Sequence, residues 1–149
     1  MSADEMARQL EDEAWAIPDA WNVVTREIIA GAIEVHRALG LGLLEKLYEE
    51  AIVYELGAAG IRYSRQVEIE VPYKTTILRG HRLDLVIEDA IVFELKSIAA
   101  LLDVHGAQLL SYLRAADMPL GFLMNFNAPV LRDGLKRLCN ERWSGFRAA

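Results

Sequence analysis

The sequence contains very little cysteine, and this scarcity removes one class of stabilising cross-link. Cys139 is the only cysteine among 149 residues, so the chain cannot form an internal disulfide. With 53% hydrophobic residues, a chain of this length can bury the core of one domain without such a bridge. A reducing cytoplasm is the simplest compartment for it, and Cys139 is expected to be a small buried residue near the end of a helix.

Long apolar runs are also missing. The N-terminus is acidic and polar, whereas a secretory signal begins with basic residues and continues with an apolar stretch. No run approaches the roughly 20 apolar residues that a bilayer-spanning helix requires. These two absences predict a soluble, cytoplasmic protein that does not insert into a membrane.

An excess of positive charge is the third absence. The chain has 16 Lys and Arg against 22 Asp and Glu, which gives a formal net charge of -6. Proteins that bind nucleic acid usually present a basic face. Part of the negative charge is concentrated at the start, and without those five carboxylates the balance of -6 falls to about -1. Tight unspecific binding to nucleic acid is therefore not expected, although a nuclease is not excluded. The five residues are Asp4, Glu5, Glu11, Asp12 and Glu13.

Hydrophobic periodicity predicts two helices in the first half of the chain. Apolar residues at steps of three and four predict a helix over 20–39, with Asp19 as its cap. A glycine-containing break over 39–42 separates it from a second helix, predicted from about 43 to 58. The apolar side of this second helix is expected to consist of Leu44, Leu47, Ala51 and Leu56.

The second half of the chain predicts a mixed sheet with one helical crossover. Apolar and charged residues alternate before Pro72, which is typical of a half-buried strand. A strand, a helix and a further strand then predict a parallel addition to an otherwise antiparallel sheet. The remaining elements are strands over 77–87 and 90–96, a helix over 103–116 capped by Asp103, a strand over 121–126 and a last helix over 131–138.

Three charged residues interrupt two apolar strands of this sheet. Asp84, Glu94 and Lys96 would each cost several kcal/mol if buried without a partner. Glu94 and Lys96 lie two residues apart, so their side chains share one face. A three-residue loop over 88–90 would place Asp84 directly across from Glu94, whereas a two-residue loop would place the carboxylates on opposite faces. We predict the three-residue loop.

Two carboxylates that lie directly across from each other on neighbouring strands repel each other unless one is protonated or a cation lies between them. Carboxylate oxygens are preferred ligands of Mg²⁺ and Mn²⁺, and such a cation could polarise a phosphate and activate water. Lys96 would then orient the water or steady the developing charge. The alternative is a cross-strand salt bridge on a solvated face, in which Asp84 or Glu94 pairs with Lys96 or Arg82. The spacing alone does not decide between the two.

Polar residues on the two flanking helices indicate a cleft beside these strands. Glu45 and Tyr48 lie on adjacent faces of the second helix. Gln108 and Tyr112 interrupt an apolar run and share one side of the helix that follows the strands. Tyr112 could equally be a core residue whose hydroxyl reaches the rim.

The other charged and titratable residues receive lesser roles. His105, near a helix start, is expected to cap the helix or face solvent, and His81 could lie behind the metal ligands. Contacts to a nucleic-acid groove would depend on a few cations that are otherwise ordinary surface charges: Arg62, Arg65, Lys74, Arg79 and Arg82.

At these positions the sequence resembles the GxxExxY proteins, a bacterial and archaeal group within the PD-(D/E)XK nuclease-like superfamily. The stretch Gly42-Leu43-Leu44-Glu45-Lys46-Leu47-Tyr48 matches the motif that names the group. Several ordered motifs at matching intervals are far more specific than one. The similarity covers about residues 23–138 and continues through 73–74, 82–84, 94–96, 108–113 and 121–127.

The resemblance implies an α/β (α+β) fold with a restriction-endonuclease-like αβββαβ core, in which helices flank a mixed four-stranded sheet. That single domain would span residues 19–140, between a polar leader over 1–18 and a tail over 141–149. The implied metal ligands are Asp84 and Glu94, with the main-chain carbonyl of Leu95. The implied catalytic residues are Lys96, Glu45 and Gln108, and the residues lining the site are Tyr48, Tyr112, His81 and Arg82.

Three functions are compatible with this sequence. The first is an Mg²⁺- or Mn²⁺-dependent phosphodiesterase acting on DNA or RNA. The second is a catalytically silent nuclease-like fold that acts as a binding or assembly module, with a protein partner or as a homodimer; Trp15, Trp21 and Trp143 could contribute to such an interface, although core packing is the expected role of Trp21. The third is an enzyme that acts on a small phosphate-bearing substrate.

Overall fold

Four helices and five strands make up the described part of the protein. The computed structural model describes residues 2–11 and 18–146. Two short 3-10 turns, Leu131–Gly134 and Ser144–Phe146, complete the chain. In order, the helices and strands are α1 (Ala3–Glu11), α2 (Asp19–Leu39), α3 (Glu45–Ala59), β1 (Tyr63–Tyr73), β2 (Thr76–Ile87), β3 (Ile91–Lys96), α4 (Asp103–Ala116), β4 (Leu120–Asn125) and β5 (Leu135–Cys139).

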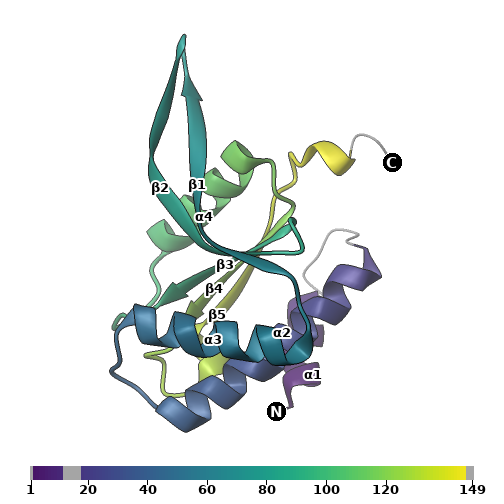
Figure 1. Ribbon diagram of the computed structural model, residues 1–149, viewed down its shortest axis with the longest axis vertical. Coiled ribbons are helices and arrows are strands. Elements are labelled where there is room, and N and C mark those ends of the chain that lie inside the picture. Colours follow the sequence, from purple (N-terminus) through teal and green to yellow (C-terminus); the bar gives the residue numbers. More distant parts are fainter. Residues whose placement is uncertain (1, 12–17, 147–149) are drawn as a thin grey trace.

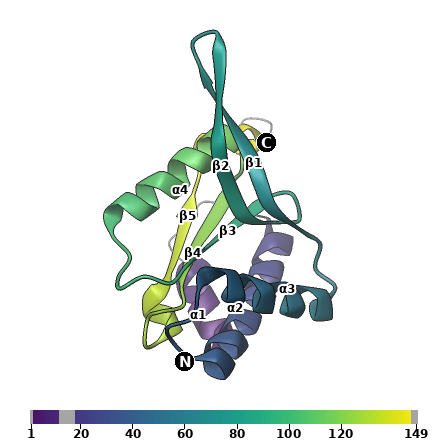
Figure 2. The same cartoon turned by 60° about the vertical axis from the view of Figure 1, so that its left-hand side comes forward.

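The strands form one mixed sheet in the order β1-β2-β3-β4-β5. β3 and β4 are parallel because α4 carries the chain back between them, and every other neighbouring pair is antiparallel. Helices α2 and α3 lie on one face of the sheet and α4 lies on the other (Figures 1 and 2). The α/β fold and the parallel addition were predicted correctly, but the sheet has five strands rather than four.

Two apolar layers fill the spaces between the sheet and the helices. The layer under α2 and α3 contains alternate residues of the central strands, such as Phe93 and Leu95. The layer under α4 contains the residues between them, such as Val92, together with Leu109 and Leu113. Since side chains alternate across a strand, Glu94 belongs to the face that α4 covers. The alternation of side chains along each strand therefore determines which helix each site residue faces.

The β2–β3 hairpin has the predicted three-residue loop. Ile87 pairs with Ile91, and the amide of Ala90 donates to the carbonyl of Ile87 at 3.0 Å. Glu88 and Asp89 adopt left-handed φ angles of 52° and 55°, a conformation that aspartate adopts more readily than most residues other than glycine. The register that follows from this loop places Asp84 across from Glu94.

The predicted last helix is wrong. Residues 131–138 form a 3-10 turn and then most of β5, which pairs with β4 from Met124↔Leu135 to Leu120↔Cys139. Leu135 and Arg137 are buried while Lys136 is exposed, so the segment has the period of a strand. Cys139 is half-buried and ends this strand, not a helix.

The first residues do not form a loosely attached leader where the structure describes them. Helix α1 packs against α2, and Met6 is 6% exposed within the core. The two predicted helix caps are also wrong, because Pro18 and Leu102 occupy the cap positions and the aspartates begin their helices. Trp21 meets Trp143 edge to face at 5.4 Å, whereas Trp15 lies outside the described residues.

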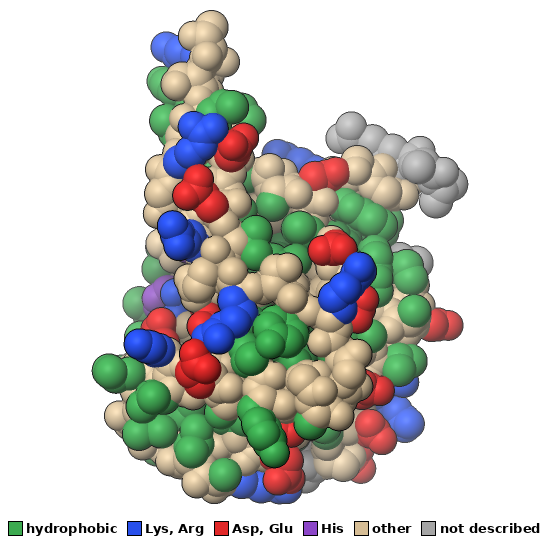
Figure 3. Space-filling view, in the orientation of Figure 1, with side chains coloured by type: hydrophobic (Ala, Val, Ile, Leu, Met, Phe, Trp, Pro, Cys, Tyr) green, Lys and Arg blue, Asp and Glu red, His purple; other side chains and the backbone are tan. Residues whose placement is uncertain are grey.

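The outer part of the β1–β2 hairpin extends beyond the body of the domain (Figures 1 and 2). Residues 72–80 are all exposed. Figure 3 shows side chains of both signs along this arm. Arg79 forms an ion pair with Glu70 at 3.0 Å. The arm therefore presents mixed charge rather than a basic stripe.

Candidate active site

Asp84 and Glu94 meet where the paired part of β2 and β3 ends. The last regular pair is Leu85 with Phe93. Beyond it, the Asp84 amide donates to Oε1 of Glu94 at 3.1 Å, and the Leu95 amide donates to Oδ2 of Asp84 at 2.8 Å. Each carboxylate thus replaces a main-chain partner that the diverging strands no longer provide.

Burial changes the acidity of Glu94. Glu94 is 6% exposed. Its burial, followed by the neighbouring charge of Asp84, raises the pKa of Glu94 to about 8. Two carboxylates in one desolvated place favour either a proton or a cation between them, and the raised pKa of Glu94 corresponds to the proton.

Lys96 continues the same strand on the face covered by α4. It lines a small hollow with Glu94, His81, Gln108 and Tyr112. Within residues 2–11 and 18–146, no carboxylate lies within salt-bridge distance of Lys96. The cross-strand salt bridge that was the simpler interpretation of this pattern is therefore absent there, and the ammonium group is available to an anionic ligand.

Asp84 and Leu95 open toward the opposite helix. They line a cleft of about 460 Å³ whose other wall is α3, including Glu45 and Lys46. Leu95 packs into the core on the same side of the sheet, where it is 1% exposed. Asp84 lines this cleft, whereas Glu94 lines the hollow under α4.

Sequence reasoning missed a polar network in this cleft. Gln66 Nε2 donates to Oε1 of Glu49 at 2.6 Å and to Oδ1 of Asp84 at 3.4 Å. Arg65 Nη2 lies 2.8 Å from Glu49 and 2.6 Å from Glu50, and these two carboxylates raise the pKa of Arg65. The only sequence signal for Glu49 was its place one residue after Tyr48 on a helix that packs on the sheet.

The structure does not bring Tyr48 into the site, contrary to prediction. Its side chain is fully buried and stacks on Phe126 with ring centroids 4.6 Å apart. Its hydroxyl donates to the Gly40 carbonyl at 2.6 Å and accepts from the Leu43 amide at 3.3 Å. Tyr48 therefore fixes the turn that leads to Glu45 rather than lining the cleft.

Replacing Tyr48 with phenylalanine should lower the free energy of unfolding by about 1–3 kcal/mol, because a main-chain carbonyl and amide lose their buried partner. Urea denaturation would measure the change. Tyr54→Phe is the matched control, since Tyr54 is 75% exposed and its hydroxyl supports no such turn. Equal stability of the two variants would contradict this role of Tyr48.

The two histidines have different surroundings. His105 accepts a hydrogen bond from the Leu102 amide at 2.8 Å through Nδ1, so it caps α4 as predicted. The His81 ring stacks on Tyr112 at 3.7 Å, and burial lowers its pKa. Tyr112 and Gln108 both line the hollow that contains Lys96, and Arg82 is exposed on β2.

Most of the cations expected to contact nucleic acid are already paired. Arg62 lies 3.4 Å from Glu88 and 3.2 Å from Asp89. Arg65 and Arg79 are paired with the glutamates described above. Among the described parts of the chain, Lys74 and Arg82 are the members of the predicted set without an ion pair. Attraction for a phosphate backbone is correspondingly small.

Carboxylate oxygens are the ligands that hard divalent cations prefer. Over residues 2–11 and 18–146, no group of three or more His, Cys, Asp or Glu side chains is arranged to hold a metal ion. Two carboxylates would therefore need main-chain oxygen or water to complete the shell, as Mg²⁺ commonly does. Each carboxylate has about four lone-pair positions, so the main-chain hydrogen bonds described above leave capacity for a cation.

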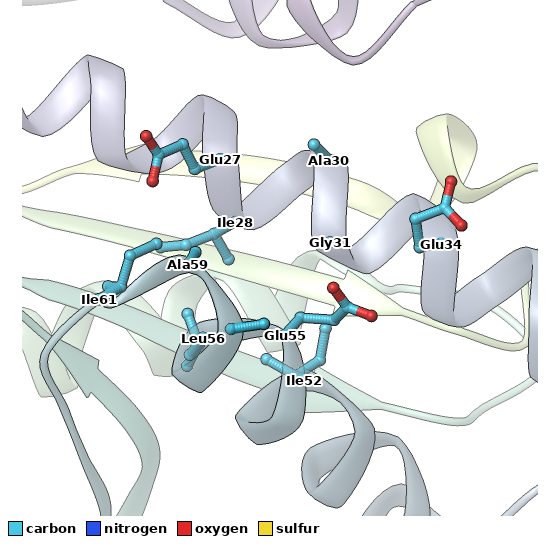
Figure 4. A pocket seen from close by; sticks show the side chains of 11 residues that line it. Glu27, Ile28, Ala30, Gly31, Glu34, Ile52, Glu55, Leu56, Ala59 and Ile61 are labelled. Atoms are coloured by element: carbon cyan, nitrogen blue, oxygen red, sulfur yellow. The ribbon is translucent and has the colours of Figure 1, made fainter.

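A second cavity lies apart from the two carboxylates and Lys96. It has a volume of about 520 Å³ between α2 and α3, and Figure 4 shows Glu27, Glu34 and Glu55 around aliphatic residues such as Leu56. Asp84, Glu94 and Lys96 are not among its lining residues. None of the described helices is long and apolar enough to cross a membrane.

The comparisons agree with the geometry at the level of the superfamily. A family model described as the PD-(D/E)XK nuclease superfamily matches residues 22–138. No curated protein and no solved structure matches the chain significantly. The matched range contains the whole sheet except the last residue of β5, and both walls of the cleft.

Proposed function

This chain belongs to the PD-(D/E)XK nuclease superfamily, and we propose that it hydrolyses phosphodiester bonds of DNA or RNA with the help of Mg²⁺ or Mn²⁺. The observation that carries the proposal is the meeting of Asp84 and Glu94 at the end of the β2–β3 pairing. The GLLEKLY stretch over 42–48 further supports assignment to the GxxExxY group.

In this proposal Asp84, Glu94 and the carbonyl of Leu95 hold the cation, and Glu45 reaches it through water from the opposite wall of the cleft. A divalent cation there would polarise the scissile phosphate and lower the pKa of a water molecule. Mg²⁺ typically uses one or two protein carboxylates together with water and substrate phosphate.

Lys96 and Gln108 act from the other side of the carboxylate pair. The oxygen of water forms a bond to phosphorus while the bridging phosphorus–oxygen bond breaks, which yields a phosphate monoester and a free hydroxyl. Lys96 positions the attacking water and stabilises the charge that grows on the phosphate oxygens. Gln108 orients Lys96 or the phosphate through its amide, and Tyr112 supports this wall by stacking on His81.

Calorimetric titration with MgCl₂ and MnCl₂ tests the cation site. The wild type is expected to bind, Asp84→Ala and Glu94→Ala are expected to lose binding, and Glu141→Ala, which removes an exposed carboxylate from outside the cleft, should bind like the wild type. Cleavage should follow on at least one of supercoiled plasmid, single-stranded DNA and RNA. Absence of cation binding by the wild type would favour the silent binding module instead, whereas binding without cleavage of any polymer would favour a small phosphate-bearing substrate.

A further inference from the structure

At Gln66, the side chains of β1 change the face of the sheet on which they lie. Tyr63 packs against the core under α2 and α3, whereas Val67 and Val71 pack against the core under α4. These odd-numbered residues would all share one face in an uninterrupted strand. Gln66 has a left-handed φ of 50°, which turns the outer half of the strand over. The outer half of β1 thereby packs against α4.

The same turn interrupts the pairing of β1 with β2 opposite Asp84. Cα pairing is regular immediately on both sides but leaves out Gln66 and Asp84. A residue other than glycine in this φ region stores strain that its surroundings must offset, and such strain concentrates at functional sites. At this point Asp84 leaves the β1 ladder and turns its carboxylate to the cleft.

The Gln66 side chain then links Asp84 to the wall of the cleft. Its Nε2 lies 2.6 Å from Oε1 of Glu49 and 3.4 Å from Oδ1 of Asp84. Both neighbours are carboxylate oxygens, so the amide NH₂ group rather than its carbonyl must face them. Glu49 is 7% exposed and is itself held by Arg65 at 2.8 Å. The amide thus has a fixed anchor on α3.

We propose that Gln66 is a positioning residue for Asp84: its left-handed backbone frees the aspartate from the sheet, and its amide holds the carboxylate in the orientation that binds the cation. This inference rests on the proposed function. Hydrogen-bond partners behind metal ligands commonly contribute tenfold to a hundredfold to metal affinity.

Gln66→Gly separates this role from a structural one. Glycine adopts a positive φ without strain, which offsets the lost hydrogen bond to Glu49, so the variant should unfold at a denaturant concentration close to that of the wild type. The variant lacks the side-chain amide that holds Asp84. Its affinities for Mg²⁺ and Mn²⁺, measured by calorimetry, should therefore fall by about tenfold or more. Gln66→Asn also tolerates this backbone but has a shorter side chain, and should show the same loss.

Lys74→Gly is the matched control, because Lys74 has a left-handed φ of 53° in the turn of the hairpin arm, away from the cleft. It should keep the wild-type cation affinity. Wild-type affinity in Gln66→Gly would overturn this inference alone, and so would unfolding of that variant. A wild-type protein that binds neither cation would overturn the proposed function together with this inference.

Discussion

Lys96→Met is expected to lower phosphodiester cleavage by at least about 100-fold while leaving divalent-cation affinity unchanged. Removal of one group that stabilises charge in a transition state typically costs two to three orders of magnitude. Lys96 lies two residues after Glu94 on the same face of β3 and is half-buried beside Gln108. Methionine replaces the four-atom apolar stem of lysine and lacks only the terminal ammonium group, so the wall of the hollow should remain packed.

Lys136→Met is the matched variant, because it removes an exposed lysine from β5, outside both the cleft and the hollow. Its kcat should equal that of the wild type within about twofold. Single-turnover cleavage with saturating substrate would compare the two variants. A Lys96→Met enzyme with unchanged kcat and a raised KM would show that Lys96 only binds the substrate, and loss of cation binding would show that it supports the fold of the metal site.

Without divalent cation, the protein should become less stable as pH rises from about 4.5 to 8. The pKa of Glu94 is raised to about 8 in the folded protein, chiefly by burial and then by the charge of Asp84, whereas 4.5 is its ordinary value. In this window the unfolded chain has lost the proton and the folded chain retains it, so the unfolded state binds fewer protons and stability falls with pH. The full loss is on the order of 5 kcal/mol above pH 8.

Urea denaturation in EDTA at several pH values would measure this loss. Glu94→Gln should remove most of the dependence, because an amide carries no proton to lose, while Glu141→Gln at an exposed position should retain it. Mg²⁺ at pH 8 should restore stability to the wild type and not to Glu94→Gln. A free energy of unfolding that differs between wild type and Glu94→Gln by a constant amount at every pH would contradict the assignment.

The strand hairpin that contains the site could be predicted because its determinants are local. Apolar runs on both sides of Glu88-Asp89 define two strands, and the choice of loop length fixes the register. Asp84 and Glu94 then follow from counting residues. The same local logic gave the bounds of α4 correctly, over 103–116.

Elements that depend on tertiary packing could not be predicted in this way. Residues 131–138 have their leucines at helical spacing, yet pairing with β4 makes most of the segment a strand. The buried side of α3 was misassigned in part: Leu56 faces the core as predicted and Tyr48 and Ile52 face it too, while the predicted Leu44 and Leu47 are 74% and 47% exposed. A helix that is apolar on two sides gives no clear orientation.

The network behind Asp84 was unpredictable for a different reason. It depends on the left-handed φ of Gln66, a conformation that glutamine rarely adopts and that no flanking glycine or proline signals. It also depends on how α3 lies against the end of the sheet, which brings Glu49 to Gln66. Neither the φ angle of Gln66 nor the placement of α3 is signalled by a local pattern in the sequence.

The pairing of arginines with carboxylates has a consequence for how a polymer would be captured. Arg62, Arg65 and Arg79 are already neutralised within the protein. A nucleic acid that binds here would displace few counterions from its own phosphates, so the equilibrium would depend only weakly on ionic strength. Long-range steering would likewise contribute little to the rate of encounter. Productive capture would then come from short-range contacts at the scissile phosphate, made after the substrate has already arrived.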